Sequence, residues 1–284
     1  MSAPVSLRRS YFARRALVSG GMTALAIGAA LVAMAPLLSV LGALVSKGAW
    51  NFRWSMLTSL PPSALDEGGG FGNALLGALI MTGIGGAIAF PLGILAAIYL
   101  AEFGGGRAAS VIRFAVRVLS GVPSIIAGVF AYGIVVLTFK SFSAWAGGVA
   151  LAVLMIPVVV IAAEQALRAV PGRLREAAYG MGATRFQAIW RVVLPTAFSG
   201  VCTGCLLAIA RAAGETAPLL FTAQFSNFWI TGLNEPTPSM SVLIHNMSGR
   251  PSDHLIAMAW TASFVLVVAV LGLNLLGRSL APKE

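Results

Sequence analysis

Long runs of apolar residues alternate with short polar segments along the chain. Each run is at least as long as the roughly 20 helical residues that cross a bilayer. Five runs carry no charge at all: 16–46, 68–101, 118–139, 141–163 and 254–277. A sixth run, 192–222, is interrupted only by Arg211 and Glu215. We therefore predict an all-α integral membrane protein with six spans, near residues 17–42, 73–100, 116–138, 145–164, 197–220 and 256–277.

Composition and charge support this fold class. The chain of 284 residues is 58% hydrophobic and only 10% charged, unlike an ordinary soluble domain. In a six-span arrangement, 14 of its 19 Lys and Arg residues lie on the side of the N-terminus and four on the other. Such a bias predicts that both termini are cytoplasmic. The net charge of +10 then reflects topology, and we expect no nucleic-acid partner because no binding motif accompanies it.

Four regions follow from this predicted topology. A basic cytoplasmic tail covers residues 1–15, and the first span with its extracytoplasmic loop covers 16–72. The transmembrane domain covers 73–277, and a second cytoplasmic tail covers 278–284.

A basic segment, residues 168–198, separates the fourth and fifth predicted spans. Residues 174–179 favour helix, two glycines interrupt it, and a capping box at 184–187 starts a second helix that is ended or kinked at Pro195. Apolar residues on one face of this second helix recur at helical spacing: Phe186, Ile189, Trp190 and Val193. Such a face fits a groove on a partner protein or, alternatively, a lipid surface.

This segment resembles the EAA loop with which ABC importer permeases dock onto their ATPases. The letters EAA stand at 176–178, Gly182 follows after three residues, and Leu194-Pro195 closes the motif, with Val192 in place of the usual Ile. The resemblance implies a coupling loop at 168–198. The residues implied to shape the ATPase contact are Glu176, Ala177, Gly182, Leu194 and Pro195.

No phosphate-binding P-loop accompanies the EAA motif. The Gly-Lys-Ser/Thr ending of such a loop occurs nowhere in the chain. We therefore expect a transport subunit that is not itself an enzyme. The resemblance implies that ATP and Mg²⁺ are bound by partner subunits, with no cofactor in this chain.

The fifth predicted span carries two charged residues inside the membrane. On a helix, Arg211 and Glu215 are neighbours and share one face with Gly200, Gly204 and Ala208. Ionisable groups in a bilayer face protein or a water-filled cavity, and small residues allow close helix approach. We therefore expect this face to line an interface between two subunits or a transport path. Two interpretations stay open: an ion pair that fixes packing, or an arginine that meets an anion while Glu215 holds or releases it.

Two further segments resemble the PstA family, one of the two permease subunits of bacterial phosphate importers. They are residues 210–223, ARAAGETAPLLFTA, and residues 119–126, LSGVPSII. The resemblance implies a type I ABC importer permease fold in the bacterial inner membrane, with phosphate as substrate. It implies as partners a PstC-like permease subunit, two PstB-like ATPase subunits and a PstS-like phosphate-binding protein. The alternatives are a permease for sulfate, molybdate or phosphonate, an ion-coupled secondary transporter, and a structural scaffold.

Other candidate residues point less clearly to chemistry. Glu164 and Arg168 lie four residues apart at the cytoplasmic end of the fourth predicted span, where they either brace the span against the coupling loop or form a simple interfacial pair. Cys202 and Cys205 have a C-x-x-C spacing, but both lie in the fifth span, where we expect them to pack as small residues. We expect no metal site.

Overall fold

The computed structural model describes residues 7–63 and 68–280, with side chains at 15–63 and 68–279. Of the two predicted cytoplasmic tails, residues 1–6 and 281–284 lie outside the described residues. All regular structure in the described part is helical. The helices and short helical turns are α1 Leu7–Leu44, η1 Val45–Ala49, η2 Trp54–Leu57, α2 Gly72–Glu102, α3 Arg107–Gly121, α4 Ser124–Ala131, η3 Tyr132–Val136, α5 Leu137–Phe139, α6 Ala144–Ala169, α7 Gly172–Gly180, α8 Arg185–Ala188, η4 Ile189–Val193, α9 Leu194–Ala213, α10 Ala217–Thr222, α11 Met240–Ser248 and α12 Asp253–Leu280.

Within the described residues, five helical stretches are long and apolar enough to cross a membrane. They are Arg15–Ala49, Gly72–Glu102, Ala144–Ala169, Arg185–Ala213 and Asp253–Ser279. These stretches correspond to the first, second, fourth, fifth and sixth predicted spans. A sixth crossing is present when α3 and the helical stretch after it are counted as one broken span. The predicted all-α membrane fold is thereby confirmed, with five spans, or six when this bent pair is counted as one.

The third predicted span is not a single helix. The prediction of one helix near 116–138 is wrong, because α3 runs from Arg107 to Gly121 and the chain turns by 107° before Ser124–Phe139. Pro123 stands at this corner, and the backbone of Val122 before it is extended, with φ −72° and ψ 127°. Proline disfavours the helical conformation in the preceding residue and cannot donate a helical hydrogen bond.

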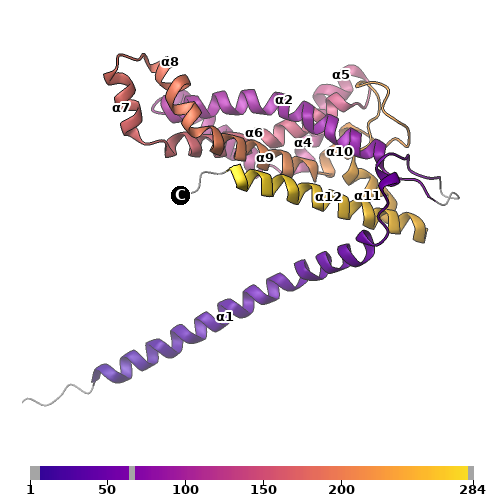
Figure 1. Ribbon diagram of the computed structural model, residues 1–284, viewed down its shortest axis with the longest axis horizontal. Helices are drawn as coiled ribbons and strands as arrows, with labels where there is room; N and C mark the ends of the chain where they lie inside the picture. Colours follow the sequence, from indigo (N-terminus) through magenta and orange to yellow (C-terminus); the bar gives the residue numbers. More distant parts are fainter. Residues whose placement is uncertain (1–6, 64–67, 281–284) are drawn as a thin grey trace, which may run out of the picture.

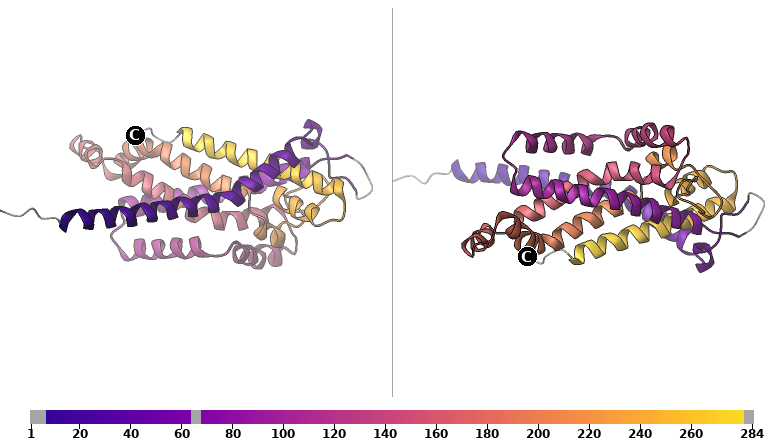
Figure 2. Two further views of the ribbon diagram at one scale, coloured as in Figure 1. Left: turned by 90° about the horizontal axis from the view of Figure 1, so that it is seen from below. Right: turned by 90° about the horizontal axis from the view of Figure 1, so that it is seen from above.

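The core of the bundle is the contact between α2 and α6, which run parallel side by side (Figure 2). Small residues bring the two backbones close: a Cβ atom placed on Gly148 would lie 2.6 Å from the Cβ of Ile84. Larger side chains fill the rest of this contact, and Met81, Leu151 and Met155 are fully buried. Because lipid is as apolar as the side chains, close packing of this kind is what holds membrane helices together.

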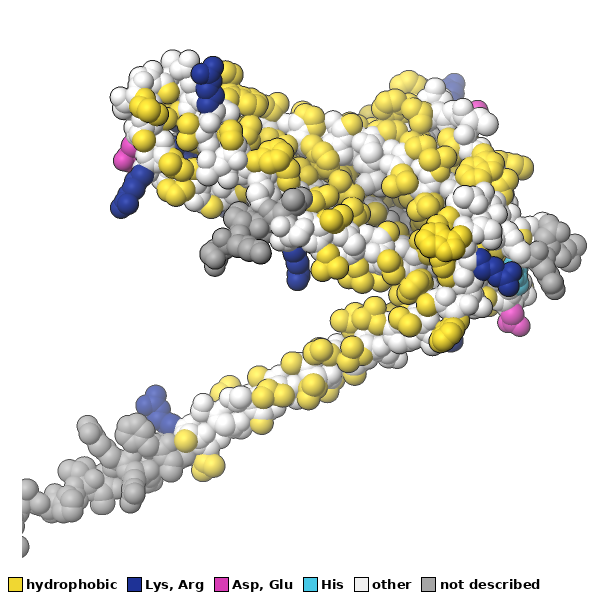
Figure 3. All heavy atoms as spheres, viewed as in Figure 1, with side chains coloured by type: hydrophobic (Ala, Val, Ile, Leu, Met, Phe, Trp, Pro, Cys, Tyr) yellow, Lys and Arg dark blue, Asp and Glu magenta, His cyan; other side chains and the backbone are white. Residues whose placement is uncertain are grey.

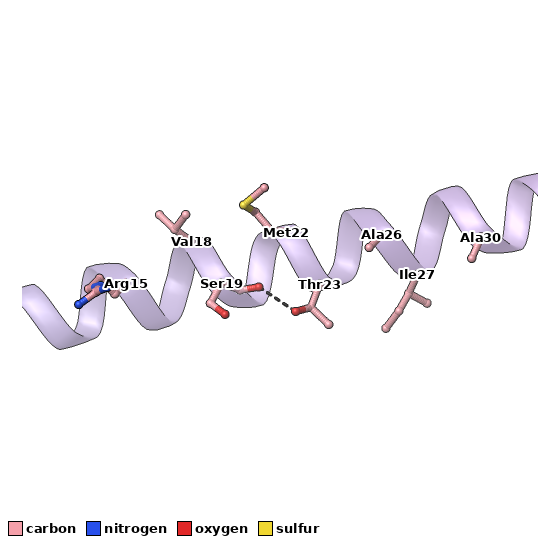
Figure 4. A pocket seen from close by; sticks show the side chains of 8 residues that line it. All are labelled: Arg15, Val18, Ser19, Met22, Thr23, Ala26, Ile27 and Ala30. Carbon is pink, nitrogen blue, oxygen red and sulfur yellow. Dashed lines mark hydrogen bonds between the residues drawn. The ribbon is translucent and has the colours of Figure 1, made fainter. Parts of the chain in front are cut away.

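The first helix stands apart from this bundle. Figure 1 shows α1 running away from the body as one long helix, and its apolar stretch is not buried by the rest of the chain. It is tied to the body at its far end, where Gly48 in η1 packs against the backbone of Trp260 in α12. An open pocket beside α1 is lined by Arg15, Ser19, Met22 and their neighbours on the same helix (Figure 4). Since its lining residues all belong to α1, this pocket does not resemble a substrate site.

The two ends of the bundle carry different elements. One end carries α7, α8 and the end of α12, and the other carries η2, α5 and α11 (Figures 1 and 2). The free α1 begins on the side of α7 and α8. On the face that Figure 3 shows, hydrophobic side chains cover the middle of the body and the described part of α1 from Arg15 onward. The arrangement matches the predicted topology, in which both termini and the coupling loop share the cytoplasmic side.

Candidate functional site

The segment that carries the EAA motif forms a protruding helical pair at the cytoplasmic end of the bundle (Figure 1). Helix α7 carries Glu176 and Ala177, both exposed, and ends before a turn in which Gly182 has a φ of +83°. That conformation strains any residue with a Cβ atom, which explains why the turn needs glycine. The predicted capping box at the start of α8 is present, because Thr184 and Gln187 bond to each other's backbone N–H groups.

The second helix of the pair continues into the membrane. It does not end at Pro195: α8, η4 and α9 form one continuous stretch, Arg185–Ala213. The irregularity lies just before the proline, where the five residues of η4 form a π-helical turn. Such a turn accommodates a missing hydrogen-bond donor by widening the helix. Leu194 and Pro195 therefore stand at the point where the coupling loop passes directly into the fifth span.

The apolar residues of this second helix face two directions. Phe186 is 69% exposed and stacks obliquely on exposed Trp190, with ring centroids 5.9 Å apart. Ile189 and Val193 are buried against α2 and α6 instead. The prediction of one outward face made of all four residues is therefore wrong for Ile189 and Val193. The helix lies along the bundle, so its inner side belongs to the core.

An ion pair that the sequence analysis missed ties α7 to the end of α2. The Nη2 atom of Arg175 lies 2.9 Å from Oε1 of Glu102, and the Glu102 side chain is only 6% exposed. Two signals pointed to it: Arg175 directly precedes the EAA letters, and Glu102 is the only acidic residue between positions 68 and 163. The sequence separation of 73 residues hid the pairing.

The predicted neighbours Glu164 and Arg168 do lie together, and a third residue joins them. Oε1 of Glu164 lies 2.8 Å from Nη2 of Arg168 and 3.3 Å from Nη2 of Arg113 on α3. Arg113 also donates to the carbonyl oxygens of Leu100 and Gly104, where α2 ends. The pair thus connects α6 with α3 and α2, a link that helical spacing alone did not reveal.

The charged residues of the fifth span are not neighbours on one helix. Helix α9 ends at Ala213, so Glu215 lies in the break before α10. The predicted contact between Arg211 and Glu215 is wrong: no ion pair joins them in the described part of the chain, and the backbone carbonyl of Glu215 accepts a hydrogen bond from Ser241 at 2.7 Å. A continuous helix would push the Pro218 ring against the carbonyl of Gly214, which explains the break.

Arg211 remains accessible. Its side chain is exposed in the single chain and forms no hydrogen bond or ion pair with the residues that the structure describes. An arginine within a membrane-spanning helix needs a polar environment, which lipid does not supply.

The small residues of α9 have a different neighbour from the one predicted. A Cβ atom on Gly204 would lie 2.5 Å from the Cβ of Ala162, and one on Gly200 would lie 2.7 Å from the Cβ of Ala166. Both contacts are with α6 of the same chain. The prediction that this strip lines a subunit interface or a path is therefore wrong, because the strip is used to pack α9 on α6.

No metal site or disulfide is apparent near these residues. Among the described residues, no group of three or more His, Cys, Asp or Glu side chains gathers closely enough to hold a metal ion. Cys202 and Cys205 are both free thiols.

A bundle of membrane helices with a protruding EAA helix pair defines a transport permease. Residues 89–283 match the family described as the inner membrane component of binding-protein-dependent transport systems, and the chain belongs to this family. It is therefore a multi-pass inner-membrane protein and a transport permease subunit. Solved ABC importers share the fold. The inward-facing methionine transporter MetNI gives a TM-score of 0.56 at 20% identity, covering 74% of this chain and 94% of its own. A bacterial alginate transporter gives 0.61 at 15% identity, covering 95% of each chain.

Within the family, the chain belongs with the PstA proteins. It is 40% identical over 249 residues to the phosphate transport system permease protein PstA of Yersinia pestis, covering 87% of this chain and 84% of that protein. The PstA protein of Haemophilus influenzae is also 40% identical, with 84% and 85% covered. PstA 1 of Mycobacterium tuberculosis H37Rv is 37% identical, with 86% and 81% covered. The resemblance predicted from the sequence is confirmed.

Proposed function

We propose that this chain is the permease subunit of an ATP-driven importer for inorganic phosphate and forms part of the path of the anion through the inner membrane. One observation carries this proposal: PstA permeases of phosphate transport systems match most of the chain at up to 40% identity. The exposed EAA helix pair supports it, since the motif resembles the loop with which ABC importer permeases dock onto their ATPases.

The proposed partners follow from the same relationship. Two PstB-like ATPase subunits bind ATP and Mg²⁺, and one of them contacts the coupling loop of this chain around Glu176, Ala177 and Gly182. Exposed Phe186 and Trp190 extend that contact with apolar area. A PstC-like permease completes the path, and a PstS-like protein delivers phosphate to the opposite end of the bundle.

Arg211 is the residue that we propose to meet the anion. Its guanidinium is always charged and presents planar paired donors that match the oxygens of a tetrahedral oxyanion. It is exposed and free of partners in the described part of the chain, so its donors remain available. Glu215, half-buried in the break that follows, offers a carboxylate that accepts a hydrogen bond from a protonated phosphate and repels sulfate.

The proposed transport cycle uses the continuity of α8, η4 and α9. Closure of the ATPase dimer on ATP displaces the coupling loop, and Leu194 and Pro195 lie where this displacement enters the fifth span. Rigid-body movement of packed helices then switches access to Arg211 from one side of the membrane to the other.

Substrate competition tests the proposal. The complex is reconstituted in proteoliposomes with its ATPase and binding protein, and uptake of labelled phosphate is measured against excess sulfate, molybdate or phosphonate. We expect unlabelled phosphate alone to compete effectively. If another oxyanion competes as strongly as unlabelled phosphate or more strongly, that oxyanion and not phosphate is the substrate.

Two variants test the path residues in the same vesicles. Arg211→Gln is expected to lower phosphate uptake at least about tenfold, since a charged hydrogen bond contributes about 1.5–3 kcal/mol. Arg107→Gln, which changes an exposed arginine at the start of α3, is the matched control. Glu215→Gln is expected to weaken discrimination against sulfate. Wild-type uptake by Arg211→Gln would show that Arg211 does not bind the anion. Unchanged selectivity in Glu215→Gln would show the same for Glu215.

A further inference from the structure

The coupling loop is fastened to the end of α2 by one arginine that uses all three of its guanidinium nitrogens. Nε and Nη2 of Arg175 donate to Oε1 of Glu102 at 3.1 and 2.9 Å. Nη2 also donates to the carbonyl of Leu167 at 2.8 Å, and Nη1 donates to that of Val170 at 2.6 Å. Arg175 therefore joins α7 to the ends of both α2 and α6, which are the two central helices of the bundle.

The second helix of the coupling loop also contacts the end of α2. Arg185, the first residue of α8, donates to the backbone carbonyl of Glu102. Its guanidinium carbon also lies 4.1 Å from the centre of the Phe103 ring, in a cation–π contact. The last residues of α2 are thus held from both helices of the loop.

Packed side chains connect the coupling loop through α2 and α6 to α9. Ile189 and Val193 of the loop are buried against Ala97 and Ile98 of α2. α2 in turn packs closely on α6, and α6 packs on α9 through Gly200 and Gly204. Closely packed interiors transmit displacement rather than absorb it. A force on α7 therefore reaches α9, which carries Arg211.

Helix α7 has an inner side, where Arg175 pairs with Glu102, and an exposed side that carries Glu176 and Ala177. The Arg175 side chain contacts the bundle and is 20% exposed, whereas Glu176 and Ala177 next to it are exposed on the surface of the chain. A buried ion pair adds little net stability, since desolvation offsets the attraction, but its directional hydrogen bonds fix geometry. We propose that Arg175 and Glu102 are a positioning pair that makes the coupling helix and α2 move as one body.

This role presupposes the ATP-driven phosphate import proposed above, and its test measures the efficiency of coupling. In purified complexes in proteoliposomes, labelled phosphate taken up is divided by ATP hydrolysed. Arg175→Ala and Glu102→Ala are each expected to lower this ratio about tenfold, and the double variant no further, because the two residues act through one contact. Arg107→Ala, an exposed arginine at the same end of the bundle, is the control and keeps the wild-type ratio.

Normalising to hydrolysis separates positioning from assembly, since a pair that only stabilised the complex would change its yield and leave the ratio intact. If an alanine variant does not assemble, Arg175→Lys is tested instead. Lysine keeps the positive charge but cannot make the same set of hydrogen bonds. The ratio of Arg175→Lys is expected to lie between wild type and the alanine level. A wild-type ratio in an assembled variant at either position, or losses that multiply in the double variant, would overturn the inference. Failure of the wild-type complex to take up phosphate at all would instead refute the proposed function.

Discussion

At the scale of single residues, the distance between helices is set by positions that have no room for a side chain. A Cβ atom on Gly204 would lie 2.5 Å from the Cβ of Ala162, closer than non-bonded carbon atoms approach each other. Gly204→Ala is therefore expected to destabilise the protein by about 1–3 kcal/mol through overpacking.

The thermal midpoint of the purified protein in detergent measures this effect. Gly272→Ala in α12 is the matched control, because a Cβ atom there meets nothing within 4 Å. Alanine improves helix propensity equally at both sites, so a difference between the midpoints reports packing alone. Equal midpoints would contradict the close contact between α9 and α6.

Residue types were readable from the sequence, but their partners were not. The charges at Arg211 and Glu215 stood out because they interrupt an apolar run. Their pairing was mispredicted, since the rule for neighbours on a helix assumes that the helix continues through Pro218. The contact between Glu102 and Arg175 escaped notice for the opposite reason: no local periodicity connects residues so far apart in sequence.

At the scale of elements, the coupling loop has an inner and an outer face that respond differently to substitution. Phe186→Ala on the outer face is expected to leave the fold intact and to weaken capture of the ATPase at least about tenfold, as for an exposed aromatic anchor. Ile189→Ala on the inner face, where the side chain is 4% exposed, is expected to destabilise the fold by about 2–5 kcal/mol.

The two variants are compared by thermal unfolding and by the amount of ATPase that co-purifies with the chain. The faces are assigned wrongly if Phe186→Ala unfolds early while Ile189→Ala keeps its stability and loses the ATPase.

Elements were predictable wherever apolar runs were uninterrupted. The spans at α2, α6 and α12 follow directly from such runs, and the capping box located the start of α8. The third span was mispredicted as one helix because apolar length alone ignored Pro123, although that residue was visible in the LSGVPSII segment. Proline corners within apolar sequence therefore limit what hydropathy can predict about helix direction.

At the scale of the whole molecule, the charge bias and the fold assign opposite sides of the membrane to the two ends of the bundle. Single cysteines in a background with Cys202 and Cys205 replaced by serine test this assignment. Trp50→Cys in the outer segment is expected to react with a membrane-impermeant maleimide in intact cells. Met181→Cys in the coupling loop is expected to react only after permeabilisation. Both wild-type side chains are highly exposed, so access rather than burial decides the outcome. The reverse pattern would invert the topology.

We propose that this chain passes phosphate through the membrane at the expense of ATP hydrolysed by partner subunits. Uptake of labelled phosphate by proteoliposomes containing the chain with its co-purified ATPase, partner permease and binding protein tests it most directly. One set of vesicles receives ATP on the ATPase side without an ion gradient, and the other receives an imposed proton gradient without ATP. We expect uptake in the vesicles that receive ATP alone. Uptake driven by the proton gradient and indifferent to ATP would contradict it and identify a secondary transporter.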